Sequence, residues 1–321
     1  MHGRSTPTPA DPAFRADVLA GLAAPIPAVP ARWLYDRRGS ELFERITALP
    51  EYYPTRTETA LLEANCVEVA HIAGTGGAVV EFGSGSSAKT PILLEAVEPS
   101  AYVPIDISGG FLRASAAALQ QRFPNLEICP VEADFMGPIR LPDAVAGVRK
   151  LGFFPGSTIG NLVPRSAVDL LRGMKDTVGE GAWLLIGMDR IKRVDILLAA
   201  YDDPQGVTAA FNLNLLHRIN AELEGDIPVS AFRHRAIWND ARARIEMHLE
   251  ASHDVAFSVA GQRFSFAAGA TIHTENSHKY GCRDARLLLL AAGWGVVREW
   301  TDPDEQFAIL LAQAEATRFA P

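Results

Sequence analysis

One short segment, residues 79–90, constrains the fold of this chain more than any other. It is VVEFGSGSSAKT: an apolar run that reaches an acidic residue, breaks at two glycines and resumes in a helical pattern. Gly83 and Gly85 permit a tight turn and let a ligand approach the backbone where a Cβ would block it. The following helix offers unpaired N–H groups to such a ligand. The segment predicts the nucleotide-binding turn of a doubly wound α/β sheet.

Two cofactors compete for this turn. The spacing of Gly83, Gly85 and Ala88 matches the dinucleotide pattern G-x-G-x-x-G/A, and Asp106 follows at a suitable distance to bind a ribose. Enzymes that use S-adenosylmethionine (SAM) share the sheet and the turn but carry an acid two residues before the first glycine, where this chain has Glu81. A carboxylate there would repel a pyrophosphate and attract a sulfonium and an ammonium group. The pattern therefore favours SAM, with a solvated Glu81 at the strand end as the simpler alternative.

The composition excludes some classes of partner. The 321 residues carry a formal net charge of −8 and contain no basic run, which argues against nucleic acid. The three cysteines, Cys66, Cys129 and Cys282, are scattered, as is usual for reduced cytosolic thiols. The longest apolar run, residues 287–297, is too short to span a bilayer. We expect a cytoplasmic monomer with neither a membrane nor a nucleic-acid partner.

A βαβ rhythm begins at residue 78. Apolar runs predict strands over 78–82, 101–106, 126–131, 149–154 and 182–188, with helices over about 88–97, 109–122 and 165–177. Apolar strands that alternate with helices are typical of a parallel sheet covered on both faces. The predicted fold class is α/β, Rossmann-like, with a doubly wound sheet.

The rhythm stops after residue 190, which indicates a second domain. Residues 191–224 have a helical pattern with a turn at 201–204, and residues 231–275 alternate as strands do, with a hairpin turn at Ala260-Gly261. A helix over about 277–292 and a turn and strand within 299–312 follow. We expect a loose tail at 1–12, an α+β substrate-binding domain from 13–64 and 191–276, and a SAM-binding domain from 65–190 and 277–321.

Further candidate residues follow the predicted strands. Ligands of open α/β sheets lie beyond the carboxyl ends of the strands. Asp106 ends the second strand and can accept hydrogen bonds from ribose hydroxyls. Asp134 and Phe135 follow the third strand, where a carboxylate and a ring suit an adenine. The loop at 155–161, after the fourth strand, is rich in small residues that allow close approach of ligands.

Several longer segments resemble one known family. They are WLYD at 33–36, GSELF at 39–43, LPEYYPTRTE at 49–58, EFGSGSSAKT at 81–90, GSTIGNL at 156–162, YDD at 201–203, AAFN at 209–212, RIEM at 244–247 and TENS at 274–277. From about residue 33 to residue 307 the chain resembles the histidine-specific N-alpha-methyltransferases of ergothioneine biosynthesis. Phe82 is a minor departure, at a position where leucine is expected.

The resemblance implies a class I methyltransferase that transfers three methyl groups in succession from SAM to the α-amino group of L-histidine. The products are hercynine and S-adenosylhomocysteine. The resemblance assigns SAM contacts to Tyr35, Gly83, Lys89, Asp106, Asp134 and Phe135, and the turn itself adds Glu81, Ser84 and Gly85.

The resemblance also implies a substrate pocket, in a cleft that closes between the two domains. In it, Asn161 and Tyr201 hold the carboxylate, Glu275 and Ser277 hold the imidazole, and Met247 and Tyr52 flank the ring. Phe43, Gly156 and Thr158 line the space around the amine. Our own hypothesis is that Tyr35, directly or through water, orients the amine and passes protons to solvent.

The residue types suit that pocket, although simpler explanations exist. Glu275 and Ser277 offer an acceptor and a hydroxyl to the two ring nitrogens, and on an extended segment they project to the same side. Residues 274–277 could instead cap a helix. Met247 could be a core residue, Tyr52 could hold a loop, and Tyr201 could simply end a helix.

Other functions remain open at this point. The His248/His253 and His273/His278 spacings do not make a convincing metal site, because the first pair lies in strand-like sequence where this spacing points to opposite faces. The same fold could methylate tryptophan or tyrosine, although Glu275 suits a carbocycle poorly. An NAD-dependent oxidoreductase and a catalytically silent nucleotide-binding module are the more distant alternatives.

Overall fold

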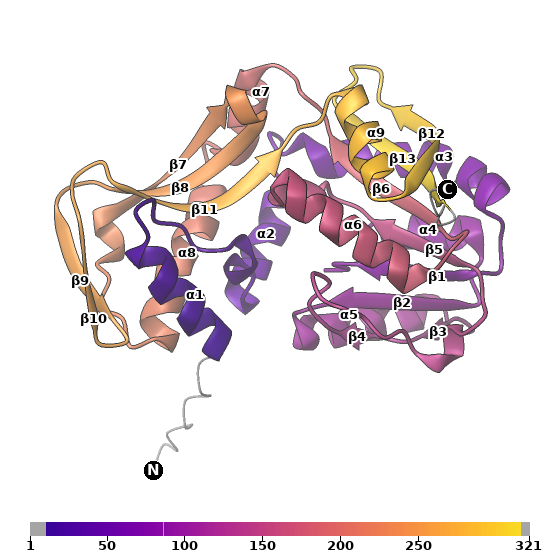
Figure 1. The fold of residues 1–321 in the computed structure, drawn as a ribbon, viewed down its shortest axis with the longest axis horizontal. Coiled ribbons are helices and arrows are strands. Elements are labelled where there is room, and N and C mark those ends of the chain that lie inside the picture. Colours follow the sequence, from indigo (N-terminus) through magenta and orange to yellow (C-terminus); the bar gives the residue numbers. More distant parts are fainter. Residues whose placement is uncertain (1–10, 86, 316–321) are drawn as a thin grey trace, which may run out of the picture. The chain divides into compact units, whose positions relative to one another are not determined.

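The computed structural model describes residues 11–85 and 87–315, which form two compact units (Figure 1). The first unit comprises described residues up to 46 together with 198–238 and 245–276. The second comprises 47–197, 239–244 and the described residues from 277 onward. The chain therefore passes between the units five times, and each unit is assembled from separate segments.

A parallel sheet forms the centre of the second unit. Its strand order is β12-β13-β6-β5-β1-β2-β3, and β4 also pairs with β2. The pairs β1/β2, β1/β5 and β5/β6 are parallel, whereas β13 is antiparallel to β6 and β12. The order reverses at β1, as it does in doubly wound sheets. The strands are β1 (Ala78–Phe82), β2 (Ala101–Asp106), β3 (Glu127–Ile128), β4 (Val131–Glu132), β5 (Lys150–Phe154), β6 (Trp183–Asp189), β12 (Trp294–Thr301) and β13 (Phe307–Ala314).

Helices cover both faces of this sheet, which confirms the predicted fold class (Figure 1). Val80 and Phe82 of β1 pack into the core beneath α6 and α9, while Val79 packs into the core beneath α3 and α4. This alternation follows from the two-residue period of a strand buried on both sides. The helices are α3 (Tyr53–Ala73), α4 (Thr90–Val97), α5 (Gly109–Arg122), α6 (Pro164–Val178) and α9 (Cys282–Ala291).

Most predicted elements of the sheet are confirmed, and the differences have local causes. The predicted strand 126–131 is two short strands, because Pro130 has no N–H to donate to the ladder. The predicted helix 277–292 is wrong in its first residues: β11 (Thr271–His278) continues to residue 278, and α9 begins only after Gly281. Strand β12 starts at Trp294, earlier than the predicted turn and strand within 299–312.

The first unit combines helices with two small sheets. One sheet has the order β11-β8-β7, and the other is the β9-β10 hairpin. The hairpin turn is confirmed: Ala260 and Gly261 lie between paired residues 259 and 262 with φ of 49° and 80°. The elements are α1 (Pro12–Ala23), α2 (Arg37–Thr47), α7 (Val194–Tyr201), α8 (Val207–Glu222), β7 (Phe232–Asn239), β8 (Arg244–Ala251), β9 (Val255–Val259) and β10 (Gln262–Phe266). Of these, α2, α7, β7 and β8 cross a unit boundary, as β11 does.

Two predicted boundaries differ from the structure. Residues 47–64 belong with the parallel sheet, because α3 is one continuous helix whose Leu61 and Leu62 pack beside Leu93 and Leu311. In the predicted tail 1–12, residues 1–10 lie outside the described residues. Pro12 is already the first residue of α1, whose N-terminus is capped by the Asp11 side chain.

The described helices are short or polar relative to a bilayer. Within residues 11–85 and 87–315, no helix is both long enough and apolar enough to cross a membrane.

Candidate functional site

The turn after β1 has the geometry that its glycines predict. Gly83 has φ of 70°, and a Cβ there would lie 3.1 Å from the Phe135 ring. Gly85 has φ of 50° and faces open space. The amides of Gly83 and Ser84 donate to the Ile105 carbonyl at 2.8 and 3.1 Å, which ties the turn to the end of β2. A side chain at residue 83 would therefore press on the Phe135 ring, and the backbone conformation disfavours one at both glycines.

Ser84 and Asp106 give this turn polar groups for a cofactor. The Ser84 hydroxyl is buried and has no hydrogen-bond partner among the described residues. The Asp106 carboxylate accepts from the Gly85 amide at 3.0 Å and from the Ser108 amide at 2.8 Å. Each carboxylate oxygen has a further lone pair for a ribose hydroxyl. A buried polar atom without a partner usually marks a group that a ligand or water satisfies, so the turn fits a nucleoside cofactor.

The segment after β4 closes over the same turn. The Asp134 carboxylate accepts from the Met136 amide at 2.9 Å, and the Phe135 ring covers Gly83. Phe135 also meets Phe154 of β5 edge to face, with 5.9 Å between ring centroids. The structure thus brings together the glycine turn, Asp106 and Phe135, as the sequence predicts for the carboxyl edge of the sheet.

Glu81 is buried, which contradicts the alternative of a solvated strand end, whereas its contact with SAM stays a prediction. Its side chain is 1 % exposed, so it is not solvated at a strand end. Its Oε2 accepts from the Thr90 hydroxyl at 2.7 Å and the Tyr102 hydroxyl at 2.5 Å. Burial raises the pKa of Glu81 to about 7, and these two donors only partly oppose the shift. Near neutral pH the group is only partly ionised, so the electrostatic argument for a sulfonium partner is weaker than its sequence position suggests.

A buried carboxylate on α3, Glu58, was missed as a site residue. Its side chain is 1 % exposed and forms an ion pair with Lys89. Both carboxylate oxygens also accept from the Gly156 amide, at 2.9 and 2.8 Å. At Gly187, a Cβ would lie 1.9 Å from Glu58 Oε1, so only glycine leaves room for the carboxylate. Glu58 therefore links the lysine of the glycine turn to the loop after β5.

A second buried carboxylate, Asp189, ends β6. The Tyr53 hydroxyl donates to both of its oxygens at 2.9 and 2.8 Å, and Lys279 pairs with it at 2.7 Å. Lys192 pairs with it as well. Burial alone would raise the pKa of Asp189, but the two ammonium groups hold that pKa below its ordinary value. Burial lowers the pKa of Lys192 to about 8, against the pull of Asp189.

The loop after β5 is ordered by its own short 3-10 helix, Thr158–Asn161. The Thr158 hydroxyl donates to the Pro155 carbonyl at 3.1 Å, and Gly156 has φ of 81°. The Ser157 hydroxyl accepts from the Asp189 amide at 2.9 Å. Asn161, at the end of this helix, is half-buried. These residues stand at the same edge of the sheet as Lys89, since a Cβ on Gly156 would lie 3.8 Å from its Nζ.

In the first unit, Tyr35 and Phe43 lie together. Their ring centroids are 5.5 Å apart, and Phe211 of α8 is 5.4 Å from Tyr35 and 6.1 Å from Phe43. Phe211 lies in the AAFN segment of the resemblance but had no predicted role. The three rings form an aromatic cluster with edge-on and tilted contacts. Tyr35 itself is half-buried.

Asn212, the residue after Phe211, organises the neighbourhood of Tyr201. The Tyr201 carbonyl accepts from His234 Nε2 at 2.8 Å, so His234 carries its proton there. Its Nδ1 then accepts from Asn212 Nδ2 at 2.9 Å. Asn212 also donates to the His248 carbonyl at 3.1 Å. Neither Asn212 nor His234 was predicted from the sequence, because their partners are more than 20 residues away along the chain.

Residues 274–277 are extended in β11, so the alternative of a helix cap is wrong. Glu275 and Ser277 are both buried and share a face of the strand. Met247 lies on β8 between Glu246 and His248, which contact each other at 3.3 Å, and therefore points to the opposite face from them. His248 stacks on His273, which shares its face with Glu275. Strand alternation alone therefore does not place Met247 beside Glu275.

Tyr52 stands at the N-terminus of α3 and is buried, next to the Tyr53 that binds Asp189. The role predicted for Tyr52 as a wall of the substrate ring stays a prediction, as does that of Met247.

Glu246, His248 and His273 resemble a metal site only in composition. Their possible ligand atoms lie within 4.8 Å of one another. However, the two imidazoles stack with an interplanar angle of 16°, and His273 Nε2 lies 3.0 Å from the Glu275 carbonyl. Lone pairs in the planes of parallel rings run side by side and do not converge on one ion. We assign this group to packing of the small sheet.

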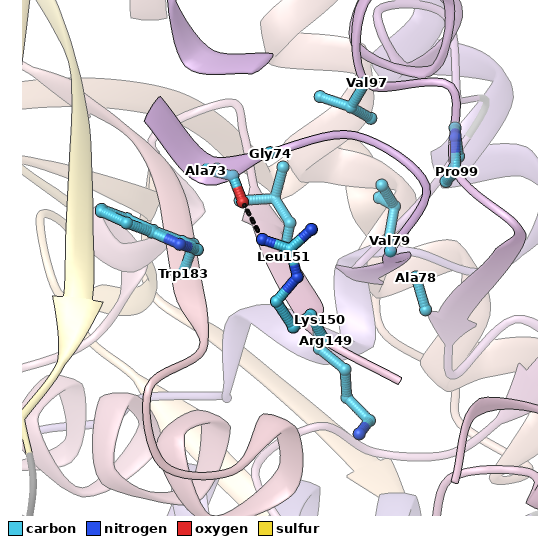
Figure 2. Close-up of a pocket in the computed structure, with 11 residues that line it drawn as sticks. Ala73, Gly74, Ala78, Val79, Val97, Pro99, Arg149, Lys150, Leu151 and Trp183 are labelled. Carbon is cyan, nitrogen blue, oxygen red and sulfur yellow. Dashed lines mark hydrogen bonds between the residues drawn. The ribbon is translucent and has the colours of Figure 1, made fainter. Parts of the chain in front are cut away.

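A small pocket in the second unit lies at the wrong edge of the sheet for a cofactor. Figure 2 shows its lining, which includes the first residues of β1, β5 and β6, and the hydrogen bond of 3.3 Å from Arg149 to the Ala73 carbonyl. Ligands of doubly wound sheets bind at the opposite, carboxyl end of the strands. The lining residues are Ala73, Gly74, Gly77, Ala78, Val79, Val97, Pro99, Arg149, Lys150, Leu151 and Trp183.

The Glu58 contacts predict a large loss of stability on neutralisation. In Glu58→Gln the Lys89 ammonium loses its charged partner, and we expect the free energy of unfolding to fall by about 2–3 kcal/mol, below the full cost of a buried pair because Lys89 is 17 % exposed. Denaturant titration measures this change. Glu63→Gln, an exposed site on the same helix, is the control and should be neutral. Equal stability of the two variants would contradict the assignment.

The raised pKa of Glu81 predicts a pH-dependent stability difference. The ordinary value of this pKa is 4.5 and the folded value is about 7, so the stabilising contribution is complete below pH 4.5 and is lost as pH rises through 7. Glu81→Gln cannot ionise, and its oxygen can still accept from Thr90 and Tyr102. Its stability relative to the parent should therefore increase between pH 4.5 and 7 by at most about 1.4 kcal/mol per pH unit. The free energy of unfolding of both proteins is measured by denaturant titration at several pH values. A difference between them that does not change with pH would refute the raised pKa.

Comparison with known proteins agrees with these features. A sequence model of the family described as "Histidine-specific methyltransferase, SAM-dependent" matches residues 14–314. The histidine N-alpha-methyltransferases of Mycolicibacterium smegmatis and Mycobacterium tuberculosis are 41 % and 42 % identical over 306 residues, which cover 94 % of each chain. Ergothioneine biosynthesis protein 1 of Neurospora crassa is 30 % identical over 308 residues, 89 % of this chain and 33 % of that longer one. The resemblance inferred from the motifs is confirmed, and the chain belongs to the family of SAM-dependent, histidine-specific methyltransferases.

Proposed function

We propose that this protein transfers methyl groups from SAM to the α-amino group of L-histidine, three times in succession, and so forms hercynine, the first step of ergothioneine synthesis. The observation that carries the proposal is the assembly at the carboxyl edge of the sheet in a chain of this family. There the glycine turn, Asp106 and Phe135 meet the Ser84 hydroxyl, which has no hydrogen-bond partner within residues 11–85 and 87–315. Membership in this family also sets aside the alternative of an NAD-dependent oxidoreductase.

The cofactor contacts follow from that assembly. Asp106 is suited to the ribose hydroxyls, Asp134 to the adenine amino group and Phe135 to the face of the base, while Ser84 and Gly85 border the turn itself. Lys89, held by Glu58, lies beside Gly156 and contributes a positive charge at this edge. Glu81 supports the turn from inside through Thr90 and Tyr102. When bound, SAM supplies a methyl group on a sulfonium, a good leaving group.

The amine chemistry requires proton removal more than it requires a nucleophilic residue of the protein. In each transfer the amine nitrogen forms a bond to the methyl carbon as the carbon–sulfur bond breaks. Starting from the ammonium, three transfers release three protons and leave a quaternary nitrogen. At pH 7 exposing the first lone pair costs about 2–3 kcal/mol at about 1.4 kcal/mol per pKa unit. Alignment of nitrogen, carbon and sulfur is therefore the main task of the protein.

The substrate contacts are those that the resemblance assigns. Asn161 and Tyr201 hold the carboxylate of histidine, and Glu275 and Ser277 bind the ring nitrogens. The resemblance alone assigns Tyr52 and Met247 to the sides of the ring, since strand alternation does not place Met247 beside Glu275. Phe43, Gly156 and Thr158 leave room for the methyl groups. Aromatic faces such as that of Phe43 can stabilise the growing positive charge by cation–π attraction.

An amino-acid panel tests the proposed substrate. Each amino acid is incubated with SAM and the purified protein, and mass spectrometry detects successive additions of a methyl group. We expect trimethylation of histidine and rejection of tryptophan and tyrosine by roughly 10⁴-fold in kcat/KM, because they leave polar partners unsatisfied. Trimethylation of another amino acid in place of histidine would overturn the proposal.

The same panel applied to Glu275→Ala separates cofactor from substrate recognition. This variant should keep its KM for SAM and lose about 10- to 100-fold in apparent affinity for histidine, the equivalent of one charged hydrogen bond. An unchanged KM for histidine would remove Glu275 from the pocket.

Tyr35 gives a second test, because we propose that its hydroxyl orients the amine and passes its protons to solvent. Tyr35→Phe keeps the ring that packs on Phe43 and Phe211 and removes only the hydroxyl. We expect kcat to fall by about 10²-fold and its pH dependence to shift, as is typical for loss of a proton-transfer group. Phe211→Leu, which alters the same cluster at a ring with no proposed ligand contact, is the matched control and should change the pH dependence of kcat less. An unchanged rate and pH profile in Tyr35→Phe would refute the role.

A further inference from the structure

We propose that Lys279 is a positioning residue for substrate selection: its buried ammonium holds the oxygen of Ser277, so that Ser277 presents its hydrogen to a bare ring nitrogen of histidine. The inference rests on the proposed function, in which Ser277 contacts the imidazole. It adds the group that decides whether this hydroxyl donates or accepts.

Burial makes the contact between Lys279 and Ser277 a strong one. The Lys279 side chain is 0 % exposed, and its Nζ lies 2.7 Å from Asp189 Oδ2 and 2.7 Å from Ser277 Oγ. An ammonium in such an interior is costly unless a charge and hydrogen bonds compensate it. Asp189 supplies the charge, and Ser277 supplies a hydrogen-bond acceptor.

The chemistry of lysine sets the direction of this hydrogen bond. An ammonium has three donors and no acceptor, whereas a serine hydroxyl has one hydrogen and two lone pairs. Lys279 therefore donates and Ser277 accepts. The adjacent cation withdraws electron density from Oγ, which strengthens the O–H as a donor and weakens the remaining lone pair. Ser277 becomes a better partner for a bare nitrogen than for an N–H.

This polarity matches one form of the substrate ring. Neutral imidazole has one N–H and one bare nitrogen, whereas imidazolium has two N–H groups. Glu275, on the same face of β11, provides an acceptor for the N–H, and Ser277 provides a donor for the bare nitrogen. Imidazolium would direct its second N–H at a hydroxyl already bound to a cation. The pair therefore selects the neutral ring.

The surroundings of Lys279 make its removal testable. Asp189 forms ion pairs with both Lys279 and Lys192. It therefore keeps Lys192 and the Tyr53 hydroxyl as partners when Lys279 is replaced. Lys192 donates to Asp189, Tyr53 and the Arg190 carbonyl, and its removal takes away an equal charge from the same carboxylate. Other titratable groups near these lysines are His278, which is close to Lys279, and Asp302, which is close to Lys192; His278 in turn lies near Arg242 and Arg244.

The experiment compares Lys279→Met with Lys192→Met in the full chain. Histidine binding is measured by calorimetry in saturating S-adenosylhomocysteine, together with KM for histidine and for SAM. We expect Lys279→Met to weaken histidine binding and raise its KM at least 10-fold with KM for SAM unchanged, and Lys192→Met to change the histidine values less than threefold. Equal losses in the two variants would overturn the proposal.

A double-mutant cycle tests whether Lys279 acts through Ser277. Because the lysine works by way of the hydroxyl, Ser277→Ala combined with Lys279→Met should bind histidine no more weakly than Ser277→Ala alone. If the two substitutions together weaken histidine binding by the product of their separate effects, the proposal is refuted, while the proposed function stays in place. If Ser277→Ala alone leaves histidine binding unchanged, the contact between Ser277 and the imidazole falls, and this inference falls with it, although methylation of histidine would stand.

The pH dependence of binding gives a readout that does not need Lys279→Met to fold. Parent protein should lose histidine affinity as pH falls from 7.5 to 5.5, because the imidazole gains its second proton near pH 6.5. In Ser277→Ala, and in Lys279→Met where it folds, this loss should be smaller, since no cation-bound hydroxyl opposes the second N–H. Profiles of equal steepness would overturn the proposal.

Discussion

Two buried carboxylates, Glu58 and Asp189, hold the loops of the sheet's carboxyl edge in place. Neither belongs to a predicted ligand set, yet each is nearly inaccessible to water and each binds a lysine and a backbone or side-chain donor from a distant part of the chain. Buried ion pairs contribute little net stability compared with apolar packing, but breaking one is costly. They therefore act here as specific connections: Glu58 links the glycine turn to the loop after β5, and Asp189 links α3, β6 and the end of β11.

The glycine turn shows how packing and chemistry share residues in this protein. Gly83 lacks a side chain because the Phe135 ring lies over it, and the same ring is the proposed surface for an adenine. Asp106 holds the Gly85 amide and is the proposed ribose acceptor. Phe135 and Asp106 thus each have a structural contact and a proposed cofactor contact. Because the structural contacts already position these groups, little reorganisation is needed when the cofactor binds.

The sequence predicted the parallel sheet well because its strands are continuous apolar runs and its turn carries glycines in a characteristic spacing. Prediction failed where a local sequence pattern is compatible with two kinds of secondary structure. Residues 277–281 resemble a helix start and are the end of a strand, and Cys129-Pro130 divides one apolar run into two strands. Glu81 was correctly placed at the turn, but its burial depends on Tyr102 and Thr90, which only the folded chain brings near. Glu58, Asn212 and Lys279 could not be found from local patterns, since their partners are distant in sequence or are ordinary backbone amides.

The interrupted chain path has a consequence for biosynthesis. Strand β13 lies between β6 and β12 but, of the strands within the described residues, leaves the ribosome last, about 120 residues after β6. Until then β6 has an open edge whose N–H and C=O groups lack strand partners on that side, a situation that favours aberrant pairing. The first unit likewise cannot be completed before residue 276 is made. Neither unit can therefore finish folding during the early part of translation, and native structure forms late and cooperatively from contacts that span most of the chain.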